Sequence, residues 1–236
     1  MFRRAACIAV AAFTMISCNA AESETPAISL DTDDSKILYT IGLAMSRQVQ
    51  QFEFSEHELA VIQKGLADGT LKRDAAVDLQ TWGPKIDSFL QARLAATGER
   101  QMAEGKAFLE KTKGEPGAEV LDSGMIVLAQ QQGVGPHPGP TATVKLNYRG
   151  TFPSGDEFDS SAPDSPVSFA LNGVVPCFSQ GIQKMKVGGK ARLVCPPELA
   201  YGPRGNPPRV PPNATLVFEV ELLEITEPEA EAQPQQ

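Results

Sequence analysis

The chain contains 236 residues, 42% of them hydrophobic, which is enough for one or two domains with buried cores. Its formal net charge of −8 at pH 7 argues against nucleic acid and against an anionic membrane surface as binding partners. The sequence has no apolar run as long as a membrane-spanning helix requires.

The first 17 residues have the pattern of an export signal. Arg3 and Arg4 form a basic start, residues 5–15 form a short apolar segment, and small residues follow. The residues before Cys18 resemble the lipobox, at which bacterial lipoproteins are cleaved and acylated on the cysteine. The alternative is ordinary signal cleavage near Ala20. Both predict export, and a lipid anchor on Cys18 would be the chain's only link to a membrane.

The two alternatives predict different locations within the cell envelope. An acylated Cys18 places the protein on the outer membrane, facing the periplasm, because Asn19 resembles the residue found after cysteine in lipoproteins sorted there. Ordinary cleavage leaves a soluble periplasmic protein. Loss of residues 1–17 removes two arginines and no acid, so the net charge falls from −8 to −10.

Two segments of the chain are predicted to be disordered. Residues 18–35 are polar and acidic, as expected of a tether, and residues 227–236 form a charged tail rich in Pro and Gln.

Residues 36–83 are predicted to form a helical dimerisation domain. Ser55 and Glu58 have the spacing of a capping box, which starts a second helix that ends near Gly69. The apolar residues of the two helices recur at helical spacing: Ile37, Ile41, Met45, Val49 and Phe52 in the first, and Leu59, Ile62 and Leu66 in the second. Neither face has a partner in this segment, so we expect two chains to exchange these helices in a homodimer. The alternative is a monomer whose first helices fold back on the next helix.

Residues 84–117 are predicted to contain a long connecting helix. The chain is helical again from Asp74, with Leu79 and Trp82 on one side, and a new helix starts at Pro84. It continues to Lys113 and is stopped by the glycines and proline of 114–117. Glycines 98 and 105 each weaken a helix by about 1 kcal/mol, so they allow a bend. A helix of this length is expected to be a rod or a coiled-coil-like interface.

Residues 118–226 are predicted to form a single α+β domain. The hydrophobic period becomes two in segments separated by Gly and Pro: 125–129, 143–151, 167–171, 190–195 and 216–225. One short helix, at about 178–185, interrupts them. The predicted fold class is therefore α+β: an antiparallel sheet wrapped around one short helix, preceded by an all-α N-terminal domain and the long connecting helix.

Three short sequences in this domain resemble one enzyme family. Asn-Tyr-Arg-Gly at 147–150, Phe-Asp-Ser-Ser at 158–161 and Leu-Ala-Tyr-Gly at 199–202 occur in the order and at the spacing of FKBP-type peptidyl-prolyl cis-trans isomerases, and the likeness covers residues 144–223. The resemblance implies an enzyme without a cofactor that assists the folding of exported proline-containing client proteins. It also implies a pocket in which a macrolide inhibitor can bind. The competing function is a holdase chaperone whose isomerase domain is a relic.

The N-terminal half also resembles this family. The sequence around residues 38–42, 58–69 and 105–109 is similar to the dimerisation domain of bacterial members related to the macrophage infectivity potentiator. That resemblance implies that helices interlock between two chains and that a long helix carries each catalytic domain.

The C-terminal resemblance identifies the residues of an apolar pocket that receives the prolyl ring. It implies that the Val175 amide and the Tyr201 hydroxyl bind substrate carbonyl groups, and that Phe178 forms the floor, where relatives have tryptophan. Asp159 is expected to orient neighbouring groups, because the reaction transfers no proton. The expected pocket residues are Tyr148, Phe158, Asp159, Val174, Val175, Phe178, Tyr201, Val210 and Phe218.

The chain departs from the family pattern at the rim of this pocket. The segment 162–166 is short and lacks an arginine that relatives have, and Val167 replaces an aromatic residue. Asn206 and Arg209 lie in a charged, Pro-rich segment and are expected to face a bound peptide. These differences, together with Phe178, leave substrate specificity and macrolide affinity open.

Two further expectations concern the cysteines after Cys18 and the two histidines. The family topology implies that Cys177 and Cys195 lie near each other, either as a disulfide or as two buried thiols. His57 and His137 have no further ligand at a suitable spacing, so we assign no metal site.

Overall fold

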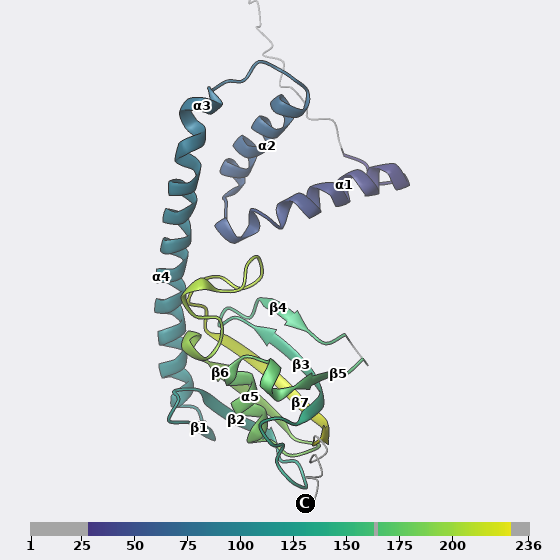
Figure 1. Cartoon of the computed structure of the whole chain (residues 1–236), viewed down its shortest axis with the longest axis vertical. Helices are drawn as coiled ribbons and strands as arrows, with labels where there is room; N and C mark the ends of the chain where they lie inside the picture. Colours follow the sequence, from purple (N-terminus) through teal and green to yellow (C-terminus); the bar gives the residue numbers. More distant parts are fainter. Residues whose placement is uncertain (1–27, 163–164, 228–236) are drawn as a thin grey trace, which may run out of the picture. The chain divides into compact units, whose positions relative to one another are not determined.

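The computed structural model describes residues 28–162 and 165–227 (Figure 1). The predicted export signal, Cys18, the first part of the tether and the tail after residue 227 lie outside this description. The chain divides into two compact units, Met1–Gly42 and Leu43–Gln236, which we treat separately. None of the helices in the described ranges has the length and apolar character needed to cross a bilayer.

In the described part of the chain, four α-helices precede the strands, and a fifth lies between the fifth and sixth strands. The α-helices are α1 (Asp33–Ser46), α2 (Glu56–Thr70), α3 (Leu79–Trp82), α4 (Ile86–Lys113) and α5 (Pro176–Gln183). The strands are β1 (Ala118–Val120), β2 (Ile126–Gln131), β3 (Thr143–Thr151), β4 (Glu157–Ser160), β5 (Val167–Ala170), β6 (Lys190–Cys195) and β7 (Leu216–Thr226). The predicted fold class is confirmed, and β1 and β4 are two short strands that the sequence pattern had not indicated.

The strands form one antiparallel sheet with the order β1-β2-β6-β7-β3-β4. On the free side of β3, two strands share the edge: β5 pairs with residues 143–146, and β4 pairs with residues 149–151. Tyr148 lies between these two paired segments. The sheet therefore opens at this residue, and its side chain can contact groups from both β4 and β5.

Alternating residues of the sheet bury two separate apolar clusters. Val127, Leu193 and Phe218 belong to the larger cluster, which also contains Phe178 and Ile182 of α5. Their sequence neighbours belong to a smaller cluster on the opposite face, namely Ile126, Val194 and Val217, with Phe108 and Leu109 of α4 packed against them. Period-two alternation thus places α5 on one face and the end of α4 on the other.

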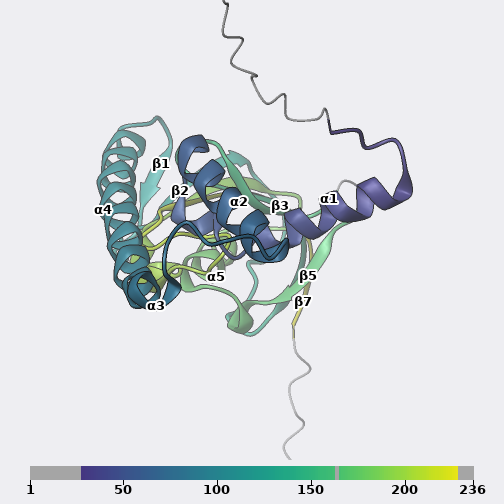
Figure 2. The same cartoon turned by 90° about the horizontal axis from the view of Figure 1, so that it is seen from above.

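The C-terminal half of α4 is part of the sheet domain rather than a free rod. Figure 2 shows α4 beside β1 and β2. Gly98, Gly105 and Thr112 are buried and recur at every seventh residue, so they lie on one helix face. A Cβ on Gly105 would overlap Thr215 Oγ1 and lie 2.9 Å from its Cβ, and one on Gly98 would lie 3.3 Å from Pro212 Cβ. These glycines permit close packing in an unbroken helix, whereas the sequence suggested a bend.

The N-terminal helices differ from expectation at their ends. The predicted continuous helix through Phe52 instead ends at Ser46, and Gln50–Phe52 forms a 3₁₀ turn that buries Phe52. The capping box of Ser55 and Glu58 is confirmed at the start of α2. Residues 74–77 are not helical, because Asp78 caps α3 by accepting a hydrogen bond from the Thr81 amide at 2.8 Å.

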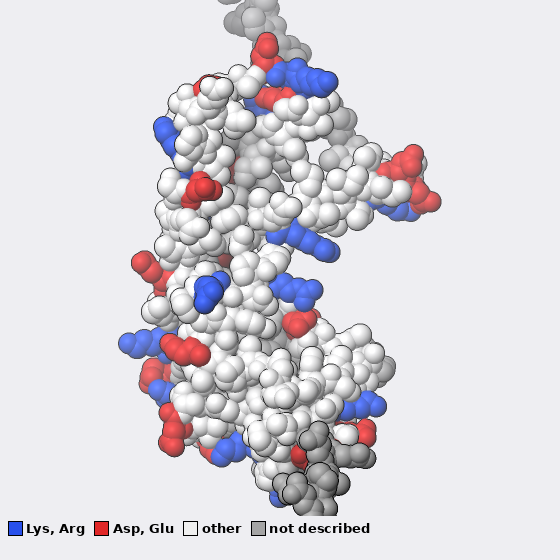
Figure 3. Space-filling view, in the orientation of Figure 1, with Lys and Arg blue, Asp and Glu red and all other residues white. Residues whose placement is uncertain are grey.

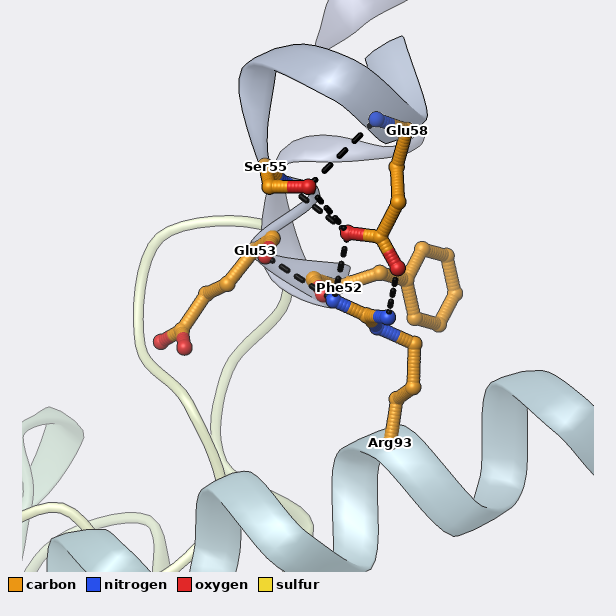
Figure 4. Close-up of polar contacts among 5 residues, drawn as sticks. All are labelled: Phe52, Glu53, Ser55, Glu58 and Arg93. Atoms are coloured by element: carbon orange, nitrogen blue, oxygen red, sulfur yellow. Dashed lines mark hydrogen bonds and ion pairs between the residues drawn. The ribbon is translucent and has the colours of Figure 1, made fainter. Parts of the chain in front are cut away.

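Arg93 of α4 joins the 3₁₀ turn and α2 to the long helix (Figure 4). Its Nε donates to the Phe52 carbonyl at 2.9 Å, and one Nη donates to the Glu53 carbonyl at 3.0 Å. Its other Nη lies 2.6 Å from Glu58 Oε1, while Glu58 Oε2 accepts from the Ser55 amide at 2.8 Å. We call these five residues the Arg93 junction. Arg93 binds the last carbonyl groups of the 3₁₀ turn and pairs with Glu58, which caps α2. The Arg93 junction therefore fixes the angle between the turn and α2.

The Glu58→Gln variant is expected to reduce the acid sensitivity of the helical segments. The Ser55 amide and the Arg93 guanidinium lower the pKa of Glu58 from 4.5 to about 2. The ionised carboxylate therefore stabilises the folded chain fully above about pH 4.5, and this contribution is lost as the pH falls toward 2. Urea unfolding followed by fluorescence of Trp82, the only tryptophan, measures the effect. Between about pH 6 and pH 3 the midpoint should fall further in the wild type than in the variant, and equal falls would contradict the assignment.

The Gly105→Ala variant is expected to be less stable than the wild type, although alanine is the better helix former. Helix propensity alone would stabilise it by about 1 kcal/mol, but overlap with Thr215 is expected to cost about 1–3 kcal/mol. Gly65→Ala in α2 is the matched control, because a Cβ there meets nothing within 4 Å. Urea unfolding should show a lower free energy of unfolding for Gly105→Ala and a higher one for Gly65→Ala, each relative to the wild type. Stabilisation by both would mean that α4 does not pack closely at residue 105.

Candidate active site

A cavity of about 310 Å³ opens at the edge of the sheet, where the partner of β3 changes from β5 to β4. Strands β3, β4, β5 and β7, the N-terminal end of α5 and the loop after β6 each contribute side chains to its wall. The lining residues are Tyr148, Asp159, Phe169, Gly173, Val174, Val175, Phe178, Tyr201 and Phe218.

Phe178 lies at the centre of an aromatic cluster that floors this cavity. It is 4% exposed, and its ring contacts three others edge-to-face, with centroids 5.8 Å from Tyr148, 6.1 Å from Phe169 and 4.8 Å from Phe218. Such pairs are stabilised by about 0.5–1.5 kcal/mol beyond their buried area, which fixes the rings. The floor is therefore apolar and rigid.

The charged group of the pocket is neutralised by its neighbours. Tyr148 donates its hydroxyl to Asp159 Oδ2 at 2.6 Å, and Arg209 donates to Asp159 Oδ1 at 3.1 Å. Burial, followed by the bond to Asp159, raises the pKa of Tyr148, so this hydroxyl stays protonated. Asp159 has both oxygens engaged within the domain, which suits an orienting group rather than a general base.

Two potential donors to a bound peptide, Val175 and Tyr201, lie in the wall of the cavity. Val175 is the N-cap of α5, and Pro176 occupies the first turn. Amides at this end of a helix have no carbonyl partner within the helix. Tyr201 lies beside a 3₁₀ turn, Gly202–Arg204, and is 36% exposed. Both positions are accessible to the carbonyl groups of a ligand in the cavity.

The structure brings together seven of the nine residues expected in the pocket. Phe158 does not line the cavity but packs behind Phe218, with ring centroids 5.7 Å apart. Val210 is also absent from the lining and is buried in the main core at 2% exposure. Phe169 and Gly173 line the cavity but were not among the expected residues. Phe169 follows Val167 by two positions on β5, so strand alternation places an aromatic ring on the same face.

Cys177 and Cys195 are joined by a disulfide, with Cα atoms 5.7 Å apart. Both residues are fully buried. Since Cys177 precedes Phe178 on α5 and Cys195 ends β6, the bond ties the helix that carries the pocket floor to the sheet.

Comparisons with known proteins agree with this architecture. Residues 135–223 match the family of FKBP-type peptidyl-prolyl cis-trans isomerases, and residues 34–126 match the domain amino-terminal to that isomerase. The Escherichia coli (strain K12) FKBP-type peptidyl-prolyl cis-trans isomerase FkpA is 35% identical, over 92% of this chain and 87% of its own length. The outer membrane protein MIP of Legionella longbeachae is 30% identical, over 92% and 97%.

A solved structure shows the same likeness in three dimensions. The crystal structure of FkpA from Escherichia coli matches with a TM-score of 0.61 and 34% identity, covering 84% of this chain and 98% of that one. The chain therefore belongs to the FKBP-type peptidyl-prolyl cis-trans isomerases that carry the amino-terminal domain, and it is an enzyme of that class.

Proposed function

We propose that the cavity above Phe178 catalyses rotation about Xaa-Pro bonds of exported polypeptides and so assists their folding in the cell envelope. The supporting observation is an aromatic-floored cavity whose acid, Asp159, is engaged by Tyr148 and Arg209. This arrangement suits a reaction that needs a shaped apolar surface and no proton transfer.

The chemistry explains why such a surface accelerates rotation. Resonance in the planar amide produces a barrier of about 18–20 kcal/mol. Twisting the bond removes charge separation, so the transition state is less polar than the planar ground state. A dry aromatic pocket therefore binds the twisted form better, and each 1.4 kcal/mol of this preference raises the rate about tenfold.

The polar groups of the rim hold the substrate while the bond turns. In this mechanism the prolyl ring rests on Phe178, and the Val175 amide and the Tyr201 hydroxyl bind the flanking carbonyl groups. Asp159 keeps the Tyr148 ring in place and carries no proton to or from the substrate. A holdase chaperone with a relic pocket is the alternative, and the isomerase names of the relatives do not favour it.

The Phe178→Ala variant is expected to lose at least about tenfold in kcat/KM on a short Xaa-Pro peptide, because the floor and its three ring contacts are removed. A protease-free isomerisation assay measures this. Phe89→Ala is the matched control, since Phe89 is 52% exposed on α4 and does not line the cavity. An inactive wild type that still suppresses aggregation would overturn the isomerase function and favour the holdase.

We further propose that the protein works outside the cytoplasm, anchored by lipid on Cys18 or free in the periplasm. The basic and apolar segments of residues 1–17 support export, and the relative named an outer membrane protein supports an envelope location. The disulfide between Cys177 and Cys195 suits an oxidising compartment of this kind.

The Cys18→Ser variant is expected to move from the membrane fraction to the periplasmic fraction, because it lacks the sulfur that would be acylated. Fractionation of cells that express the full chain measures this, with wild type as reference. A variant that stays with the membrane, or a wild type that is already soluble, would exclude the lipid anchor.

We also propose that two chains form a homodimer through their N-terminal helices. Six residues of the predicted helix faces are 38–58% exposed in the single chain: Ile37, Ile41, Met45, Leu59, Ile62 and Leu66. The Arg93 junction brings the start of α2 to α4 through polar contacts and leaves the apolar residues Leu59, Ile62 and Leu66 of α2 exposed. Helices exchanged between two chains would bury such faces.

Sedimentation of residues 22–236 is expected to give a dimer at micromolar concentration, and deletion of residues 22–82 is expected to give a monomer. The expectation follows from the apolar area on α1 and α2, which the deletion removes. The isomerase assay on the shortened protein checks that its pocket remains folded. A full-length monomer, or an unchanged association state after deletion, would contradict the dimer.

A further inference from the structure

Two more cavities continue from the prolyl pocket toward the 3₁₀ turn Gln50–Phe52. The first, of about 480 Å³, shares Asp159 with the pocket and has Phe158 in its wall. The second, of about 210 Å³, shares Gln50, Phe152 and Arg209 with the first. The shared walls join the three cavities into one groove, which we call the flanking groove where it extends beyond the pocket.

The far wall of the flanking groove is fixed by the fold. Gln50 and Glu53 belong to the turn whose carbonyl groups are held by Arg93, and Gln101 and Glu104 belong to α4. The near wall comes from residues 152–156, which connect β3 to β4, and from the segment around Arg209. Both walls are thus attached to α4 or to the sheet, so the groove is present without a bound ligand.

The lining of the flanking groove carries more acid than base. Arg209 is already paired with Asp159 at 3.1 Å. Arg100 forms an ion pair with Glu53, and its Nε lies 3.9 Å from Glu104 Oε1. One guanidinium therefore balances the charge of only one of these two carboxylates. The Asp156 carboxylate accepts a hydrogen bond from the Ser154 hydroxyl, a neutral group, at 2.8 Å. Charges of both signs are scattered over the face drawn in Figure 3. The lining of the flanking groove, in contrast, contains more acidic than basic residues.

We propose that the flanking groove binds the substrate chain beyond its proline and selects polypeptides with basic residues a few positions from that proline. The inference rests on the proposed isomerase function, because the groove begins at Asp159 in the wall of that pocket. An extended chain advances about 3.3 Å per residue, so a few residues suffice to enter the next cavity. Lysine and arginine have flexible stems that pack on Phe152 and Pro153 while their cations approach Glu104 and Asp156.

Peptides of matched length test this inference. A neutral Xaa-Pro tetrapeptide is compared with peptides extended on either side by four residues that include two Lys, two Gln or two Glu. We expect kcat/KM to follow the order Lys, Gln, Glu on one side of the proline, with a Lys-to-Glu ratio of about five- to tenfold at low salt. The ratio should approach one at about 1 M salt, because these groups are exposed to solvent.

Variants show whether the flanking groove is the source of this ratio. Asp156→Asn combined with Glu104→Gln should bring the Lys-to-Glu ratio close to one. Asp122→Asn combined with Glu224→Gln removes the same charge from exposed positions outside the groove and should keep the wild-type ratio. Because both peptides are measured on the same preparation, the ratio does not depend on the folded fraction of a variant.

The outcomes separate this inference from the proposed function. A wild type inactive on every peptide would overturn both. Activity on the tetrapeptide, with equal rates for the Lys and Glu peptides on both sides, would retain the isomerase and overturn the basic preference. That result is also expected if a second copy of the chain covers the groove. A Lys-to-Glu ratio that stays at the wild-type value in the Asp156→Asn and Glu104→Gln double variant would also overturn the proposed basic preference of the flanking groove.

Discussion

The sheet buries apolar residues on both of its faces, and the rest of the structure depends on how it does so. Helix α5 covers one face, and the C-terminal half of α4 covers the part of the other face that β2, β6 and β7 form. The second contact is possible only because Gly98 and Gly105 bring the helix backbone next to Pro212 and Thr215. Helix α4 is consequently part of the catalytic domain at one end and holds the N-terminal turn through Arg93 at the other. One helix, rather than a flexible linker, therefore joins the sheet domain to the turn Gln50–Phe52 and the start of α2.

The cavity above Phe178 forms where β3 changes its partner strand. Strand β3 changes partner from β5 to β4 near Tyr148, and the gap is filled by aromatic rings instead of a neighbouring strand. Phe178 extends from α5 into the middle of these rings. Without it, the other rings would surround a void. Because α5 is tied to β6 by the Cys177–Cys195 bond, the floor of the pocket is positioned by the same packing that stabilises the domain.

The sequence allowed the fold class and most of the pocket to be predicted, because these depend on local patterns and short motifs. Strand alternation located β3 and β6, and the capping box located the start of α2. Long-range packing was harder to predict. Glycines 98 and 105 looked like weak points in a helix, although their spacing of seven with Thr112 is a signal for a close-packed face. Val210 and Phe158 lie at family positions, but whether a ring lines a cavity or supports it depends on neighbours distant in sequence.

An apolar pocket with a carboxylate in its wall appears contradictory until the neighbours of Asp159 are considered. The Asp159 side chain is 42% exposed, and without partners its charge would favour the more polar, planar amide. Tyr148 and Arg209 together take up both carboxylate oxygens, and the Arg209 guanidinium offsets the charge of Asp159. Tyr148 is therefore held with its ring facing Phe178 and its hydroxyl turned to Asp159. In the proposed mechanism, the polar network and the aromatic floor thus serve one requirement: a cavity that offers the twisted amide a surface of low polarity, with hydrogen-bond donors at the rim.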